Sequence, residues 1–161
     1  SYAAAAENFY ASLNGAEQRT RGWYGARLKK IRAVLELEAG EYQSALKFYR
    51  EGLTILSSLD ESAKIEGGQS RRLKADLLSG IASVQLKIGL YSEAVANLEA
   101  ALVTLDDSRF DNYNRPFILN DFGHLLNEQR SYRQAIGYLE KAAQIWQQQK
   151  DWRNYAMAQQ N

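Results

Sequence analysis

The chain has 161 residues, enough to bury one substantial core, and its 45% hydrophobic and 24% charged residues are typical of a soluble globular domain. Twenty basic and nineteen acidic residues give a formal net charge of +1, so no overall field favours nucleic acid or an anionic membrane. The absence of cysteine excludes disulfides, thiolate catalysis and cysteine zinc sites, and it suits a cytoplasmic protein. No apolar run approaches the ~20 residues of a membrane helix.

One short pattern occurs four times, beginning at Tyr2, Tyr42, Tyr91 and Tyr132, which are 40, 49 and 41 residues apart. Each copy has a small residue three positions after the tyrosine, a large apolar residue after seven and a small residue after ten. Because these offsets fall on one helical face, we expect four helices whose small residues let a second helix approach closely. The positions are Ala5, Ala45, Ala94 and Ala135; Phe9, Tyr49, Leu98 and Leu139; and Ser12, Gly52, Ala101 and Ala142.

A second helical pattern precedes the repeated one and is clearest from Arg71 to Lys87. Glycine suits the left-handed position after a helix, so we expect Gly40 and Gly89 to end such helices. Since only a residue or two then separates the helices, they must form an antiparallel pair, and repeated pairs stack into a solenoid. The predicted pairs span residues 16–58, 71–105 and 113–149, with partial repeats at 1–13 and 151–161.

The polar segment from Ser57 to Ser70 accounts for the longest interval between copies. We expect a solvated linker or helix extension there, the alternative being a loop that contacts a partner. Farther along, Pro116 suits the first turn of a helix. Its cap is expected to be Asp111, Asn112 or Asn114.

The segments GEYQSA at 40–45 and GLYSEA at 89–94 resemble the turn and second helix of a tetratricopeptide repeat. The segment LNDFGH at 119–124 is similar to the first helix of the longer repeats found in kinesin light chains and bacterial regulators. The resemblance implies an all-α, right-handed superhelical solenoid of about seven to eight helices. The length indicates one domain over residues 1–161. Because a helical pattern is interrupted at Asn161, we expect this domain to be part of a longer chain. Arg130 and Ser131 depart from the turn pattern. Arg32 replaces an apolar residue, so we expect its helix to be rotated or irregular.

No motif in the chain predicts catalysis or a cofactor. The segment GGQSRR at 67–72 precedes a helix, where phosphate can bind, but it lacks the Walker lysine pattern and a preceding strand. His124, the only histidine, supports neither a metal site nor a catalytic triad, and we expect it on the surface or in a groove. We therefore expect no enzyme activity, cofactor or metal. Trp146, Trp152 and Tyr155 are expected to pack the last helix pair rather than form an exposed platform.

One segment near the start of the chain is locally basic, with Trp23 and Tyr24 among the cations and no acidic residue. On a helix these cations cannot all share one face. We expect a solvated outer face balanced by Glu36, Glu38 and Glu41, and the alternative is an electropositive patch for an acidic peptide or a nucleic-acid backbone. The cations are Arg19, Arg21, Arg27, Lys29, Lys30 and Arg32.

The resemblance also implies a binding surface, because the first helices of such pairs line a concave groove that receives a partner. Within it, Asn120, His124 and Asn127 are spaced by four and three and are predicted to form one polar stripe. Asparagine amides both donate and accept hydrogen bonds, which suits holding the backbone of an extended peptide. The full predicted groove comprises Lys30, Val34, Ser79, Ser83, Lys87, Asn120, Asp121, His124 and Asn127.

These patterns predict a cytoplasmic scaffold for protein–protein interaction that binds a peptide or partner protein in the groove. We expect no small-molecule substrate and no membrane partner, and nucleic acid is not favoured. One alternative is a sensor or autoinhibitory arm of a larger bacterial enzyme or regulator, such as a caspase-like protease or a transcription factor. A second is a self-assembly module that associates through the C-terminal helix, since a half-pair leaves an apolar face uncovered.

Overall fold

The computed structural model describes residues 18–59, 68–105 and 114–160, with side chains for residues 20–156 of these ranges. All regular structure in these ranges is α-helical, which confirms the all-α class there. The repeat copy at Tyr2, the two cap candidates Asp111 and Asn112, and the side chain of Arg19 lie outside the described residues. The helices are α2 (Gln18–Glu38), α3 (Tyr42–Ser58), α4 (Gln69–Lys87), α5 (Tyr91–Thr104), α6 (Arg115–Glu128), α7 (Tyr132–Gln148) and α8 (Trp152–Gln160).

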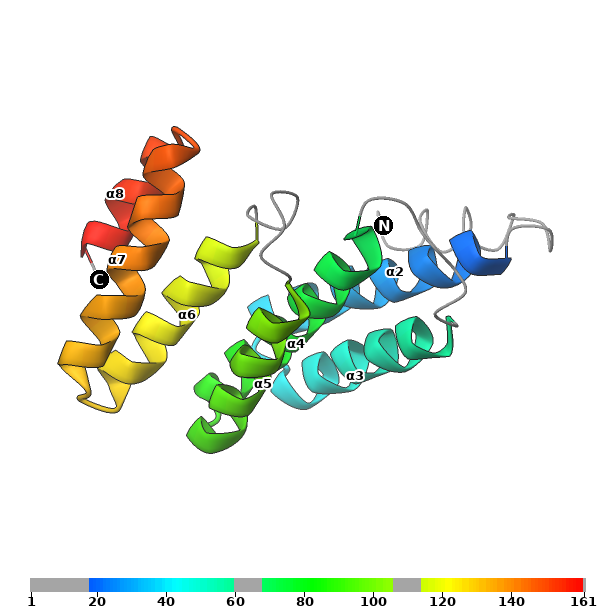
Figure 1. Ribbon diagram of the computed structural model, residues 1–161. Helices are drawn as coiled ribbons and strands as arrows, with labels where there is room; N and C mark the ends of the chain where they lie inside the picture. The colour runs from blue at the N-terminus through cyan, green and yellow to red at the C-terminus, as the bar shows by residue number, and fades with distance from the viewer. Residues whose placement is uncertain (1–17, 60–67, 106–113, 161) are drawn as a thin grey trace.

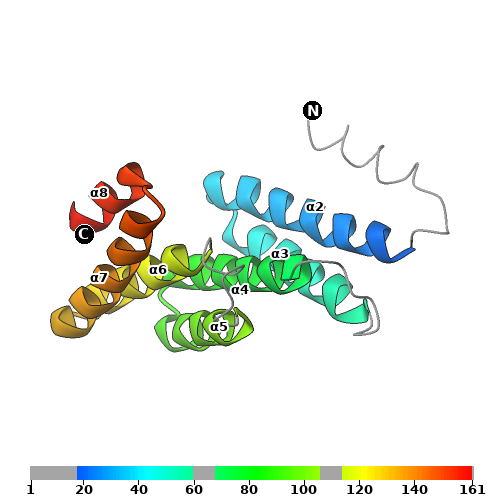
Figure 2. The same ribbon diagram turned by 45° about the horizontal axis from the view of Figure 1, so that its top comes forward.

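Consecutive helices pack in pairs, α2 with α3, α4 with α5 and α6 with α7. Figures 1 and 2 follow the array from α2 and α3 at one end to α7 and α8 at the other. The first helices of the pairs also contact one another, since α4 packs against both α2 and α6. None of the described helices combines the length and apolarity that crossing a membrane would require.

Four turns end their helices in the same left-handed conformation. Gly40 and Gly89 have φ of +79° and +78°, as predicted, whereas Arg130 and Lys150 adopt φ of 58° without being glycine. At each turn the next amide donates to the carbonyl five residues earlier, over 2.8–2.9 Å, which satisfies a backbone group at the helix end. The same hydrogen bonding therefore makes all four turns, whichever residue occupies the left-handed position.

The large residue of two repeat copies packs against a glycine of the preceding or following first helix, at positions outside the repeat pattern. A Cβ atom added to Gly80 would lie 2.3 Å from the ring of Tyr49, and one added to Gly123 would lie 2.5 Å from Leu139. Both large residues are buried, with 3% and 7% of their surface exposed. In the three described copies every predicted small and large position is buried: Ala45, Gly52, Ala94, Ala101, Ala135 and Ala142, and Tyr49, Leu98 and Leu139. The repeat thus forms the packing surface between helices.

The structure contradicts two expectations about individual side chains in part. Arg32 does not make its helix irregular, because α2 is one continuous helix and Arg32 is exposed, with its guanidinium 4.7 Å from the centre of the Phe48 ring. Trp146 is fully buried and Tyr155 packs against the cluster around it, as expected, but Trp152 is 58% exposed at the start of α8. The rings of Trp152 and Tyr155 form a T-shaped contact, with their centroids 6.0 Å apart.

Candidate functional site

A hollow of about 330 Å³ lies where the first helices α2, α4 and α6 meet. This central hollow contains three of the nine predicted groove residues, Lys30, Ser79 and Ser83. Each lies on the side of a first helix that faces another first helix rather than its own partner. The lining residues are Lys30, Asp76, Ser79, Gly80, Ser83, Asn114, Phe117 and Ile118.

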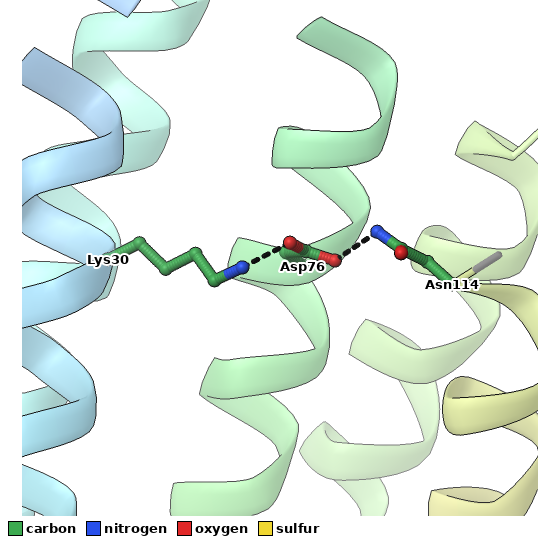
Figure 3. A network of polar contacts seen from close by, with 3 residues as sticks. All are labelled: Lys30, Asp76 and Asn114. Carbon is green, nitrogen blue, oxygen red and sulfur yellow. Dashed lines mark hydrogen bonds and ion pairs between the residues drawn. The ribbon is translucent and has the colours of Figure 1, made fainter. Parts of the chain in front are cut away.

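A polar chain crosses the central hollow from one helix pair to the next. Lys30 of α2 forms an ion pair with Asp76 of α4, and the side-chain amide of Asn114 donates to the other oxygen of the same carboxylate (Figure 3). Asn114 is the N-cap residue of α6, with Pro116 in the first turn as predicted, yet its side chain makes no capping bond. Asp76 therefore joins both neighbouring helices, and Lys30 is part of the wall rather than a free cation.

A second polar bridge joins α4 to α6. The hydroxyl of Ser79 donates to a carboxylate oxygen of Asp121 over 2.9 Å, and Ser83 donates to the backbone carbonyl of Ser79 over 3.1 Å. Burial raises the pKa of the Asp121 carboxyl to about 6, and the Ser79 hydrogen bond only partly opposes this shift. Lys30, Ser79, Ser83 and Asp121 are thus all engaged within the protein.

Tyr49 of α3 lies beneath this face and is only 3% exposed, with its ring against Gly80 of α4. Burial raises the pKa of its hydroxyl to about 12, and the charges of Asp76 and Asp121 act in the same sense. Tyr49 therefore stays neutral. Sequence reasoning treated Tyr49 only as the large residue of a repeat and missed Asp76, although Asp76, Ser79 and Ser83 follow the spacing of one helical face.

The predicted polar stripe on α6 is not continuous, which corrects the expectation that its three residues share access to a partner. Asn120 is only 6% exposed, whereas His124 and Asn127 are exposed. Helical spacing sets the direction of a side chain around its own axis, but neighbouring helices decide how deeply each position is covered. The other two predicted groove residues, Val34 and Lys87, are exposed and lie outside the lining of the central hollow.

The described cations of the basic segment do not all gather in one patch, although Lys29 and Arg32 both lie over the ring of Phe48. Lys29 pairs with Glu51 of α3, with 2.7 Å between the charged atoms, whereas Lys30 pairs with Asp76 of α4. Adjacent side chains on a helix point about 100° apart, so Lys29 and Lys30 form ion pairs with different helices. Of the others, Arg27 lies over the ring of Trp23, Arg32 lies over that of Phe48, and the Nε atom of Arg21 is buried.

The central hollow has a mixed polar and apolar lining. It combines hydroxyl, amide and carboxylate groups with an apolar wall from Phe117 and Ile118. Among the side chains that the structure describes, no group of three or more histidine, aspartate or glutamate residues could hold a metal ion. No protein-family model matches the chain, and a search of curated proteins finds no match.

Proposed function

We propose that the chain is a protein-interaction module that binds an extended peptide segment of a partner across the first helices α2, α4 and α6. The observation that carries this proposal is the central hollow, whose polar lining comes from Lys30 of α2, from three residues of α4 and from Asn114, the N-cap residue of α6. We further propose that the pairs form a solenoid of the tetratricopeptide type, with this face as its groove. In such an arrangement the repeated residues pack the helices and the unrepeated ones contact the partner.

Preorganisation supports binding at this face. The ion pair of Lys30 with Asp76, and the amide of Asn114 on the same carboxylate, hold three side chains in place before a partner arrives. Ordering an interface side chain during binding costs about 0.5–1.5 kcal/mol, so side chains that are already held lose less entropy. The polar chain in Figure 3 therefore supports both the packing of the pairs and the binding surface.

The aromatic part of the apolar wall of the central hollow is also held in place before binding. Phe117 is 36% exposed, and its ring meets the buried ring of Trp146 edge to face, with the centroids 5.3 Å apart. A ring held in this way offers a fixed apolar surface to a peptide side chain. The hydroxyl of Ser83 lies on the same hollow and can accept a hydrogen bond from a peptide amide.

The size of the central hollow limits what it can take. Its volume of about 330 Å³ is near the lower end for ligand sites. It would therefore hold one or two side chains of a peptide rather than a drug-sized ligand. The rest of a bound peptide would continue along the first helices. There the exposed predicted residues Lys87 and Asn127 lie farther along α4 and α6.

A steric block of the central hollow tests the proposal. Peptides enriched from a display library on the wild-type protein are measured by fluorescence anisotropy against Ser83→Arg, which fills the hollow, and Ser92→Arg, which adds the same side chain at an exposed position on α5. We expect Ser83→Arg to weaken binding at least about tenfold, or about 1.4 kcal/mol, and Ser92→Arg to leave it unchanged. Equal binding by both variants would refute the proposed site. Lys30 and Asn120 are unsuitable targets, because one is paired with Asp76 and the other is buried.

A further inference from the structure

A larger hollow of about 680 Å³ lies between α2 and the outer side of α3. It shares no lining residue with the central hollow. We call it the basic groove, and it is lined by Lys29, Gln43, Leu46, Lys47, Arg50, Glu51, Thr54 and Ile55. Four of these, Gln43, Lys47, Arg50 and Thr54, recur along α3 at intervals of four, three and four residues, so they form one stripe roughly 16 Å long.

Positive charge is concentrated at the basic groove although the whole chain carries a formal charge of only +1. Three cations line it, Lys29, Lys47 and Arg50, against the single carboxylate of Glu51. The hydrogen bond from Lys29 lowers the pKa of the Glu51 carboxyl, and the charges of Lys29, Lys47 and Arg32 act in the same sense. With Lys29 already paired to Glu51 over 2.7 Å, the lining keeps a surplus of positive charge on the exposed residues Lys47 and Arg50.

The basic groove also has an apolar floor. Leu46 is 5% exposed and Ile55 is half-buried, and along α3 they lie on either side of the charged residues of the lining. A single-stranded nucleic acid fits this lining poorly, because no aromatic side chain lines the groove to stack a base. A peptide with both carboxylates and apolar side chains matches the charge and the floor.

We propose that the basic groove is a second docking surface, for an acidic peptide segment of a partner protein. Carboxylates of the segment pair with Lys47 and Arg50, and its apolar side chains contact Leu46 and Ile55. The stripe on α3 has room for about five residues in extended conformation. This inference is independent of the proposed function, because the two surfaces lie on different sides of α2 and share no residue. One chain could then hold two segments at once, which raises avidity without new contacts.

Charge reversal tests the second surface. The probe is a short fluorescently labelled peptide of glutamates interspersed with leucines, and its binding is measured by anisotropy at low and high salt. We expect Lys47→Glu with Arg50→Glu to weaken binding at least about tenfold. The matched control is Arg133→Glu with Arg153→Glu, which makes the same charge change at exposed positions of α7 and α8 and should leave binding within about twofold.

Several results would overturn the inference. Equal losses in the two double variants would show that only net charge matters, and a glutamine version of the probe that binds as tightly would show that carboxylates are not recognised. Tighter binding of a labelled single-stranded oligonucleotide would assign the surface to nucleic acid. Absence of saturable binding to the wild-type protein would also refute it. The Ser83→Arg variant should bind this probe as tightly as the wild type does. Binding at the basic groove can therefore be tested independently of binding at the central hollow.

Discussion

Gly80→Ala is expected to destabilise the protein even though alanine favours helices. Gly80 lies in α4 against Tyr49 of α3, and an added Cβ would be 2.3 Å from one ring carbon and 2.4 Å from the next. Real Cβ atoms essentially never come so close, so one side must move. Tyr49 is only 3% exposed and its ring has little room to withdraw.

Two opposing terms set the magnitude. Replacing glycine by alanine inside a helix stabilises by roughly 0.8–1 kcal/mol through propensity. Inserting a methyl group into a packed contact costs about 1–3 kcal/mol. We therefore expect a net loss of about 1–2 kcal/mol for Gly80→Ala, because the contact involves a buried ring rather than the end of a flexible chain.

Gly137 of α7 supplies the matched control, since nothing lies within 4 Å of a Cβ added there. Gly137→Ala should show only the propensity term and gain about 0.5–1 kcal/mol. Urea unfolding followed by circular dichroism measures both variants against the wild type, and thermal melting should move by roughly 2–4 °C per kcal/mol. If Gly80→Ala stabilised the protein as much as Gly137→Ala, the inferred close contact between Tyr49 of α3 and Gly80 of α4 would be refuted.

Two further changes test the electrostatics and the turns. Because burial raises the pKa of Asp121 from 3.8 to about 6, its favourable contribution is complete below about pH 4 and is lost as pH rises through 6. Asp121→Asn keeps an acceptor for Ser79 and should avoid a loss of up to about 3 kcal/mol between pH 4 and 7 in urea unfolding, whereas parallel pH profiles would contradict this. Arg130→Gly should gain roughly 0.5–1 kcal/mol, since Arg130 holds φ at 58° where glycine carries no Cβ penalty. If Arg130→Gly left the melting temperature unchanged, the inferred backbone strain at Arg130 would be refuted.

The repeat was a reliable guide to the fold because it encodes contacts that are local in the chain. Ala94 and Leu98 lie on one face of α5, and both are fully buried. Gly40 and Gly89 were predictable for a similar reason, since glycine is the residue that most readily adopts the left-handed conformation after a helix. Arg130 was harder to foresee, because the hydrogen bonds of the turn form there without glycine.

The candidate site was predicted only in part, because its contacts join residues far apart in the chain. Lys30 and Asp76 are separated by 46 positions, and Asp76 and Asn114 by 38. The resemblance predicted that Lys30 and Ser79 line a groove, but it did not show which side chains they would contact. Asn120 was misjudged for a related reason, since its exposure depends on the helices around α6 and not on its spacing from His124.

The sequence by itself determined that the described part of the chain is helical, that the helices pair through short turns, and where small residues allow close packing. These properties follow from periods of three and four residues and from local backbone preferences. Only the tertiary structure decided the use of each polar side chain. Lys29 and Lys30 are adjacent in the sequence, yet one pairs with α3 beside the basic groove and the other with α4 in the central hollow. The direction of each follows from the angle between neighbouring helical positions, but its partner depends on how the pairs stack.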